Sequence, residues 1–540
     1  MRINWLKIKE DRNLRNFEID FDETVPITVL LGRNGSGKSN LFEDIVEIFI
    51  ALEEVSPVSR FAYEIEYYCH ENLIHIAADP SRNAQRIQIS VNGAKVSPSQ
   101  FKKKLHDYLP RHVFAYYSGW NGRLESIFSG PTKRYYRANL EGADVNAARR
   151  FFFCRKDYAN LALMALFFET HELANYIRTE LLDIDEFESA LIVMRSPWWA
   201  RQSRSSNAEE NEFFWGARGN FTDFMERLRE SALAPIRNME STEGDIRGRT
   251  QNVERLYLYI RDRNHLEKIK APYESPKIVF NHLESMYLSD LIEEIRVVGR
   301  KKGGEKVRFD QLSEGEQQLV AVFGLLLFTQ TDEALYLLDE PDSHLNPRWT
   351  YEYRDLLKRA LYSVDQATIE ISRQNDPIDV GSPPGASGNS QVLIATHNPL
   401  MVSAHPRTHV RILTNDGEKT TAVPPDDEPP GMSIDRLLTS EVFGLRTALP
   451  QRTLNVIKER ERLASQKNKT EDEEIELRRL SSELEVNGLL RTFRLPEENE
   501  FIETMKRREK KALEDLSPEE IDERNARADV LLEEILRQKS

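Results

Sequence analysis

The stretch GRNGSGKS at residues 32–39 decides the fold. It follows the apolar run VPITVLL (25–31) and precedes SNLFEDIVEIFIALEEV (39–55), whose apolar residues recur at helical spacing. A buried strand, a glycine-rich loop and a helix in this order are typical of a phosphate-binding loop. The glycines let backbone amides converge on phosphate oxygens, and the helix N-terminus adds positive potential. The alternative is an ordinary glycine-rich turn.

The residues of this loop predict a site for a nucleoside triphosphate with Mg²⁺. Lys38 is expected to reach the β and γ phosphates, and the Ser39 hydroxyl is expected to bind the metal. The residues expected to contact the nucleotide are Gly32, Arg33, Asn34, Gly35, Ser36, Gly37, Lys38, Ser39 and Asn40.

The segment ALYLLDEPDSHLNP (334–347) is predicted to be a buried strand that ends in two carboxylates. Asp339 would orient the Mg²⁺ shell, and Glu340 would accept a proton from an attacking water. Side chains alternate along a strand, so both carboxylates reach one site only through a turn, which we expect Pro341 to supply. The alternative is a solvated acidic turn.

Two further segments place polar residues beside apolar ones. In QLSEGEQQLV (311–320), Ser313 or the amide of Gly315 could bind an anion, although Ser followed by Glu three residues later is also a plain capping box. In QVLIATHNPL (391–400), a strand ends at His397, which could donate to a γ-phosphate oxygen or be purely structural.

The four motifs, in this order, resemble those of ABC-type ATPases of the SMC, RecF, RecN and overcoming-lysogenization-defect group. The resemblance implies an α/β fold, an ABC-type head with a mixed sheet and an antiparallel β subdomain, and ATP as the nucleotide. It also implies a dimer around two ATP molecules, in which the signature residues of one chain complete the site of the other. These residues are Ser313, Glu314, Gly315 and Glu316, while His397 would sense the γ-phosphate and residues 343–346 would cross the dimer seam.

One departure concerns the glutamine loop of that group. It should follow the strand HVFAYYSG (112–119), yet the next glutamine is Gln202. Ser118 is the remaining candidate to complete the Mg²⁺ shell.

Within this group, the length of the chain and the segment SIDRLLTSEVFGLRT (433–447) are similar to the PtuA family of Septu and Septu-like retron antiphage systems. This resemblance implies control of a separate HNH nuclease (PtuB-like) and, in retrons, contact with a reverse transcriptase and its single-stranded DNA. The alternative is a RecF- or SMC-like DNA-repair ATPase that clamps DNA.

The pattern of the chain predicts four parts. Residues 1–125 and 281–448 form the two halves of the head, residues 126–280 form a mostly helical inserted lobe, and residues 449–540 form a charged helical tail for partner or oligomer contacts. Short alternating segments from Phe61 to residue 119, the last being HVFAYYSG, predict an antiparallel sheet beside the first strand.

Composition narrows the possible partners. The 540 residues carry a net charge of −15, so nucleic acid contact is expected only at local patches. Basic stretches mixed with Tyr116, Tyr135, Tyr136, Trp198 and Trp199 are candidates for such contact, or else are core aromatics beside solvated cations. Two cysteines and no apolar leader predict a cytoplasmic protein without membrane segments.

Overall fold

The structure is a computed structural model that describes residues 1–486, apart from 23–24, 55–58, 120–121, 142–148, 156–157, 170, 198–211, 218, 244–249, 330–332, 363–389, 441, 444–450 and 467–469. The chain divides into two compact units, Met1–Leu445 and Arg446–Ser540. The Trp198-Trp199 pair and the tail beyond residue 486 lie outside the described residues. Within the described ranges, every helix is too short or too polar to span a bilayer.

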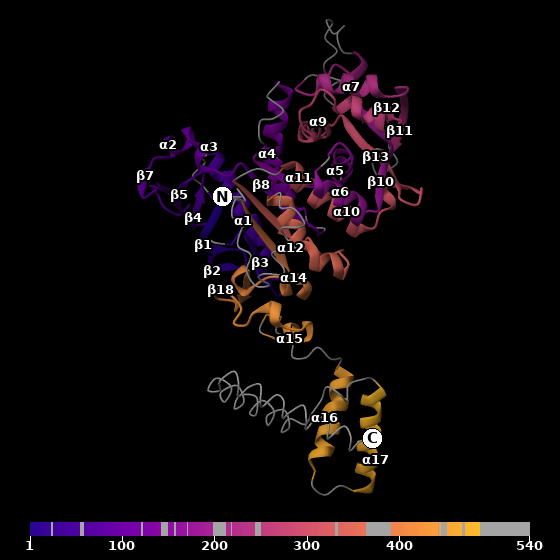
Figure 1. The fold of residues 1–540 in the computed structure, drawn as a ribbon. Helices are drawn as coiled ribbons and strands as arrows, with labels where there is room; N and C mark the ends of the chain where they lie inside the picture. Colours follow the sequence, from indigo (N-terminus) through magenta and orange to yellow (C-terminus); the bar gives the residue numbers. More distant parts are fainter. Residues whose placement is uncertain are drawn as a thin grey trace, which may run out of the picture. The chain divides into compact units, whose positions relative to one another are not determined.

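The first unit is built around a 13-stranded mixed sheet. In spatial order its strands are β7 (Ala94–Val96), β6 (Ile87–Val91), β5 (Asn72–Ala78), β4 (Tyr63–Cys69), β1 (Arg2–Asp11), β2 (Leu14–Asp20), β18 (Thr420–Val423), β17 (Val410–Asn415), β3 (Ile27–Gly32), β16 (Gln391–Thr396), β15 (Ala334–Asp339), β8 (His112–Tyr117) and β9 (Phe151–Cys154). From β17 to β9 all neighbours are parallel, and from β7 to β2 all are antiparallel. A parallel centre thus continues into an antiparallel arm, as the sequence predicted (Figure 1).

The parallel centre forms because its strands are apolar on both faces. All six residues of β15 and of β16 are buried, as is β3 from Ile27 to Leu31. Continuous apolar runs are typical of parallel strands that are covered on both faces. Leu338 pairs with Ile394, and Ile394 pairs with Val29, so the carboxyl ends of the three strands are nearly level.

One strand prediction is wrong. Residues 112–117 do not belong to the antiparallel part, because they form β8, which runs parallel to β15 and places Phe114 beside Tyr336. Five of the six residues of β8 are buried, whereas β4 in the arm alternates buried and exposed positions. The apolar run HVFAYY therefore has the character of a central strand, and its aromatic residues fill both sides of the sheet.

Helices cover the sheet and fill the rest of this unit. They are α1 (Lys38–Glu54), α2 (Pro98–Lys103), α3 (Leu105–Tyr108), α4 (Arg123–Leu140), α5 (Tyr158–Leu166), α6 (Glu172–Tyr176), α7 (Thr222–Ser231), α8 (Arg263–Lys270), α9 (Pro276–Leu288), α10 (Glu314–Leu319), α11 (Leu325–Thr329), α12 (Pro347–Tyr362), α14 (Pro399–Ser403) and α15 (Ile434–Thr439). Shorter π or 3₁₀ turns are η1 (Ile177–Leu181), η3 (Glu212–Phe214), η4 (Phe309–Gln311), η5 (Val320–Gly324), η6 (Arg407–His409) and η7 (Pro429–Gly431).

Residues 126–280, which the sequence predicts to be a mostly helical lobe and which we call the lobe below, contain helices and also strands that the sequence analysis did not predict; one of these strands, β9, pairs with β8 in the large sheet. A five-stranded antiparallel sheet has the order β11 (Ile236–Glu243), β12 (Thr250–Ile260), β10 (Ile184–Arg195), β13 (Ile292–Lys301) and β14 (Lys306–Arg308). Strands β13 and β14 form a hairpin over the segment IRVVGRKKGGEKVRF (295–309). In β12, Leu256, Leu258 and Ile260 are buried at every second position, which is the period of a half-buried strand.

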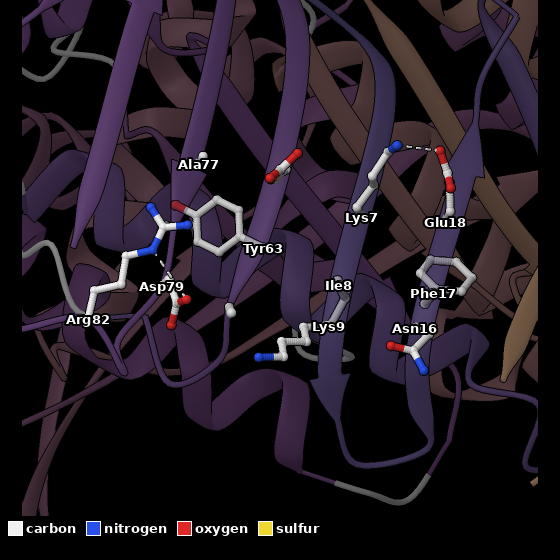
Figure 2. A pocket seen from close by; sticks show the side chains of 13 residues that line it. Lys7, Ile8, Lys9, Asn16, Phe17, Glu18, Tyr63, Ala77, Asp79 and Arg82 are labelled. Atoms are coloured by element: carbon white, nitrogen blue, oxygen red, sulfur yellow. Dashed lines mark ion pairs between the residues drawn. The ribbon is translucent and has the colours of Figure 1, made fainter. Parts of the chain in front are cut away.

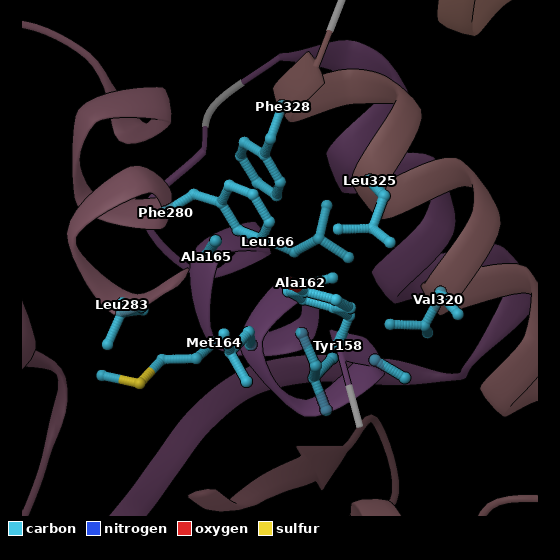
Figure 3. Close-up of a cluster of buried hydrophobic side chains, with 14 of the residues drawn as sticks. Tyr158, Ala162, Met164, Ala165, Leu166, Phe280, Leu283, Val320, Leu325 and Phe328 are labelled. Carbon is cyan, nitrogen blue, oxygen red and sulfur yellow. The ribbon is translucent and has the colours of Figure 1, made fainter. Parts of the chain in front are cut away.

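A continuous hydrophobic core joins the lobe to the helical run that begins at Glu314. This run consists of α10, η5 and α11, and Figure 3 shows side chains of η5 and α11 packed against α5 and α9. A Cβ on Gly324 would lie 3.0 Å from the Cβ of Ala162, so the two backbones approach closely. The rings of Phe280 and Phe328 stack with centroids 5.2 Å apart. A shift of the run would displace the lobe, because close-packed interiors transmit strain.

The second unit begins with two helices, α16 (Gln451–Ser465) and α17 (Glu471–Val486). Leu463, Leu480 and Leu484 are almost fully buried, and Arg460 Nε donates to Ser481 Oγ at 3.3 Å. Part of the charged tail is therefore a packed helix pair.

A buried ion pair joins Arg149 to Glu284 in α9. The Arg149 guanidinium contacts the Glu284 carboxylate, with side chains only 7% and 4% exposed. Arg149 Nη1 and Glu284 Oε1 each lie 3.2 Å from the Tyr158 hydroxyl, and Arg149 Nη2 donates to Thr132 at 2.9 Å. Burial raises the pKa of Glu284, and Arg149 opposes that shift. The pair thus links four separate segments of the first unit.

Removing one partner of this pair is expected to be costly. Arg149→Ala leaves Glu284 buried without its cation, so we expect a loss of about 3–5 kcal/mol in the free energy of unfolding. The measurement is urea unfolding of both proteins. Arg263→Ala, which removes an exposed pair with Glu267, is the control and should cost under about 1 kcal/mol. Equal effects of the two substitutions would show that the buried pair does not stabilise the lobe.

Candidate nucleotide-binding site

The motif residues collect at the carboxyl ends of three adjacent parallel strands. Lys38 begins α1 just after β3, Asp339 ends β15, and His397 follows β16. Because these strands are neighbours with nearly level ends, their loops meet at one edge of the sheet. This edge is where open α/β sheets generally bind ligands.

The phosphate-binding loop has the backbone that its glycines predict. Gly35 and Gly37 have φ values of 84° and 109°, a region that favours glycine. The amide of Ser36 donates to the carbonyl of Arg33 at 3.0 Å and closes the turn. The loop leads directly into α1, so the unpaired amides of the first helical turn are available to an anion.

Lys38 is buried beside the two acidic residues at the end of β15. Its Nζ donates to the carbonyl of Gly32 at 2.7 Å, and the residue is only 6% exposed. Burial lowers the pKa of Lys38, while the charges of Asp339 and Glu340 raise it. A cation in this position can pair with phosphate oxygens.

Asp339 is a buried carboxylate that lacks a conventional hydrogen bond. Both of its oxygens are enclosed without a partner among the described residues, and the residue is 1% exposed. Burial raises the pKa of Asp339 to about 6; Ser39 and Lys38 lower it, and Glu340 raises it further. An orphaned carboxylate beside a hydroxyl fits Mg²⁺, because both supply the oxygen ligands that this ion prefers.

The described part of the chain contains no cluster of three or more His, Cys, Asp or Glu side chains able to hold a metal. The residues that could hold Mg²⁺ here are Ser39 and Asp339, with phosphate oxygens as the remaining ligands. This arrangement is usual for Mg²⁺, which commonly binds through one or two side chains plus the phosphates of a substrate.

Glu340 reaches the site through its own backbone conformation. Its φ is 52°, in the left-handed region, and its amide donates to the carbonyl of Ala395 at 2.8 Å. The turn therefore starts at Glu340, one residue before Pro341, where the sequence analysis places it. Glu340 Oε1 lies 3.2 Å from His397 Nδ1, so the predicted base and the predicted γ-phosphate sensor are in contact.

Asp342 is a site residue that the motif search did not single out. It is 4% exposed, and both of its oxygens accept from the Thr396 hydroxyl, at 3.1 and 3.0 Å. The same hydroxyl accepts from the amide of Asn398 at 3.0 Å. Burial raises the pKa of Asp342, and Thr396 lowers it. Asp342 thus fixes the loop after β15 to the loop that carries His397.

The signature residues lie against this loop within their own chain. Ser313 and Glu316 form the capping box expected as the simpler alternative, with the Ser313 amide donating to Glu316 at 2.7 Å. A Cβ on Gly315 would lie 2.5 Å from the carbonyl oxygen of His344, and His344 Nδ1 lies 3.2 Å from Glu314. Ser313 and Glu314 are nevertheless exposed, so capping leaves them accessible to a second chain.

The structure places two further residues that the sequence analysis names, Ser118 and Tyr116. Ser118 follows β8 and lies beside the site, because its amide donates to the carbonyl of Asp339 at 3.3 Å and its Oγ is 3.2 Å from Ser343 Oγ. Tyr116, in contrast, is only 8% exposed and packs in the core, so it cannot stack on a nucleic acid base. Asn40 contacts Arg12 and Asn13, which were not predicted as site residues.

A cavity of about 430 Å³ lies on the antiparallel arm, over β1, β2, β4 and β5 (Figure 2). Two ion pairs flank it, Lys7 with Glu18 at 2.7 Å and Arg82 with Asp79 at 3.4 Å. None of its lining residues belongs to the motifs described above. The site of predicted chemistry is therefore the loop cluster and not this cavity.

Lys38→Ala is expected to remove nucleotide binding. It deletes a charged donor to two phosphates, so the Kd for Mg-ATP should rise about 100-fold or more. Isothermal titration calorimetry measures this change. Lys306→Ala, which removes an exposed lysine paired with Glu188, is the control and should bind as the parent chain does. Retained affinity in Lys38→Ala would contradict the assigned loop.

Comparisons with known proteins agree with these motifs. A family model described as "AAA domain, putative AbiEii toxin, Type IV TA system" matches residues 161–403. The Septu protein PtuA of Bacillus mycoides (strain KBAB4) is 24% identical over 188 residues, which cover 32% of this chain and 23% of that protein.

Solved structures of Smc heads also match. One, bound to the C-winged helix domain of ScpA, is 15% identical with a TM-score of 0.32 and covers 78% of this chain and 97% of its own. Another, from Pyrococcus furiosus with an extended coiled coil and the C-terminal domain of ScpA, is 14% identical with a TM-score of 0.31, covering 78% and 96%. The chain is thus similar, over part of its length, to an AAA-type family model and to the Septu protein PtuA, and its motifs meet at one edge of the sheet.

Proposed function

We propose that the chain binds ATP with Mg²⁺ and hydrolyses it. The observation that carries this proposal is the meeting of Lys38, Ser39, Asp339, Glu340 and His397 at the ends of three neighbouring strands. The amides of residues 33–39 and the Lys38 ammonium hold the phosphates, since both offer positive potential to oxygen anions. When bound, Mg²⁺ supplies neutralisation of the charge on the β and γ phosphates.

Glu340 acts as the general base in this proposal. Its carboxylate is about one-third exposed, so it can accept a proton from a water near the γ-phosphate. His397, 3.2 Å from Glu340, orients the carboxylate and can donate to a phosphate oxygen. The left-handed backbone at Glu340 fixes the direction of this side chain relative to Asp339.

Glu340→Gln separates binding from hydrolysis. The amide cannot accept the proton, so kcat should fall about 100-fold or more while Mg-ATP still binds. Phosphate release and calorimetric titration of the same preparation test this. Glu305→Gln, an exposed acid in the β13–β14 turn, is the control. Normal turnover by Glu340→Gln would exclude Glu340 as the base.

We further infer that two chains share each nucleotide. Glu314 contacts His344 in the loop 343–346 of its own chain, and both Ser313 and Glu314 are exposed, so a second copy can reach them. In ABC-type ATPases, which the motif order resembles, this shared arrangement closes a homodimer. Gln318, in the same helix as Glu314, donates to the carbonyl of Pro341, the residue after Glu340. A movement of this helix when a second chain docks would therefore shift the backbone next to Glu340.

A mixing experiment tests the shared site. Ser313→Arg should block docking of the signature but leave ATP binding intact, at a helix-cap cost of about 1 kcal/mol. Neither Ser313→Arg nor Lys38→Ala should hydrolyse ATP alone. An equal mixture should regain about a quarter of normal activity, since half the dimers are mixed and each carries one complete site. A mixture as inactive as its components would contradict the shared site.

The larger role we propose is regulation of an antiphage nuclease. The support is the relationship to PtuA, and the physical route is the core that joins the signature run to the lobe. The partner would be an HNH nuclease, with a reverse transcriptase and single-stranded DNA in a retron setting, all in the cytoplasm. Affinity purification of the tagged chain with its neighbouring gene products tests this role. Recovery of the chain without any nuclease subunit would exclude it.

A further inference from the structure

The turn between β1 and β2 lies directly against the phosphate-binding loop. A Cβ on Gly37 would lie 2.6 Å from Leu14 Cδ2 and 3.3 Å from Asn13 Oδ1. A side chain at Gly37 would require the Leu14 side chain to shift, and the φ of 109° also favours glycine at this position. The β1–β2 turn therefore packs against the phosphate-binding loop, although β18 and β17 separate β2 from β3 in the sheet.

The Asn13 side chain forms two hydrogen bonds across this contact. Its Nδ2 donates to the carbonyl oxygen of Gly35 at 2.5 Å, and its Oδ1 accepts from Asn40 Nδ2 in the first turns of α1. A carboxamide suits this contact because it carries a donor and an acceptor on one carbon. Gly35 has a left-handed backbone and is the exposed one of the three glycines in the loop. The hydrogen bond from Asn13 restrains its carbonyl.

The position of Asn13 is itself fixed by another part of the chain. Its backbone carbonyl accepts from Asn415 Nδ2 and from the Thr420 hydroxyl, each at 2.7 Å. These two residues lie at the facing ends of β17 and β18 and pair with each other in the ladder. A hairpin about four hundred positions along the chain thus holds the turn in place.

An ion pair holds the β1–β2 turn against α1. The neighbouring Arg12 donates to Asn40 Oδ1 at 3.1 Å and contacts the Glu43 carboxylate of α1. Its φ is 51°, which is uncommon for a residue with a side chain. The turn is therefore tied to α1 by an ion pair and to the loop by Asn13.

We propose that Asn13 is a positioning residue for the bound nucleotide, held by Asn415 and Thr420. This inference rests on the proposed nucleotide site. By restraining the Gly35 carbonyl and Asn40, Asn13 fixes the directions of the amides between them, which are the groups that meet the phosphates. Asn13 does not contact Glu340 among the described hydrogen bonds, so it should affect binding rather than the chemical step.

The test compares Asn13→Ala and Asn13→Asp with Arg15→Ala. The aspartate keeps the shape and the acceptor but places an oxygen against the Gly35 carbonyl. Arg15 contacts the same hairpin, donating to Gly417 at 2.8 Å, and its described hydrogen bond and ion pair do not involve residues 32–39. Loss of both side-chain hydrogen bonds should raise the Kd and KM for Mg-ATP by about fivefold or more in Asn13→Ala, and the repulsion in Asn13→Asp should raise them further. The kcat of the two Asn13 variants at saturating Mg-ATP should stay within about twofold of the parent chain. In Arg15→Ala, the Kd and KM should stay within the same limit.

A second measurement needs no nucleotide. Amide hydrogen exchange across residues 33–41 should be faster in both Asn13 variants than in Arg15→Ala or the parent chain. Unchanged exchange, or a fall in kcat at constant Kd, would overturn the proposal. If the parent chain itself did not bind Mg-ATP, the proposed function would fail, and the exchange result would still decide whether Asn13 orders the loop.

Discussion

The structure depends on the parallel pairing of β3, β16 and β15. Each strand is buried over almost its whole length, so hydrophobic burial fixes their order and register. That register brings three loops that are far apart in the sequence to one edge of the sheet. Lys38, Asp339 and His397 are neighbours for this reason, and the polar contacts among the loops then set the finer geometry.

The loop after β15 connects this edge to the rest of the first unit. Asp342 ties it to Thr396, the carbonyl of Pro341 accepts from Gln318, and the carbonyl of His344 lies under Gly315. From Gly315 the helical run continues into the core shared with α5 and α9. Packed contacts therefore run without interruption from the loop after β15 to α5 and α9.

Local sequence patterns were enough to predict most of the residues that meet at the candidate site, but not every strand of the fold. The motif residues could be predicted because strand, turn and helix signals lie within a few residues of each chemical group. Asn13, Asp342 and Asn415 could not, since their partners are distant in sequence and single asparagines or aspartates are ordinary turn residues. The position of β8 was misjudged because its flanks suggested alternation, while its pairing with β15 is decided by burial on both faces.

The central claim is that one chain's phosphate loop and another chain's signature enclose the same Mg-bound triphosphate. The most direct measurement is a structure determined with Mg²⁺ and a non-hydrolysable ATP analogue. We expect the γ-phosphate between Lys38 of one copy and Ser313 of the other, with Mg²⁺ on Ser39 and Asp339. An analogue bound by a single copy, or bound away from residues 32–39, would contradict the account.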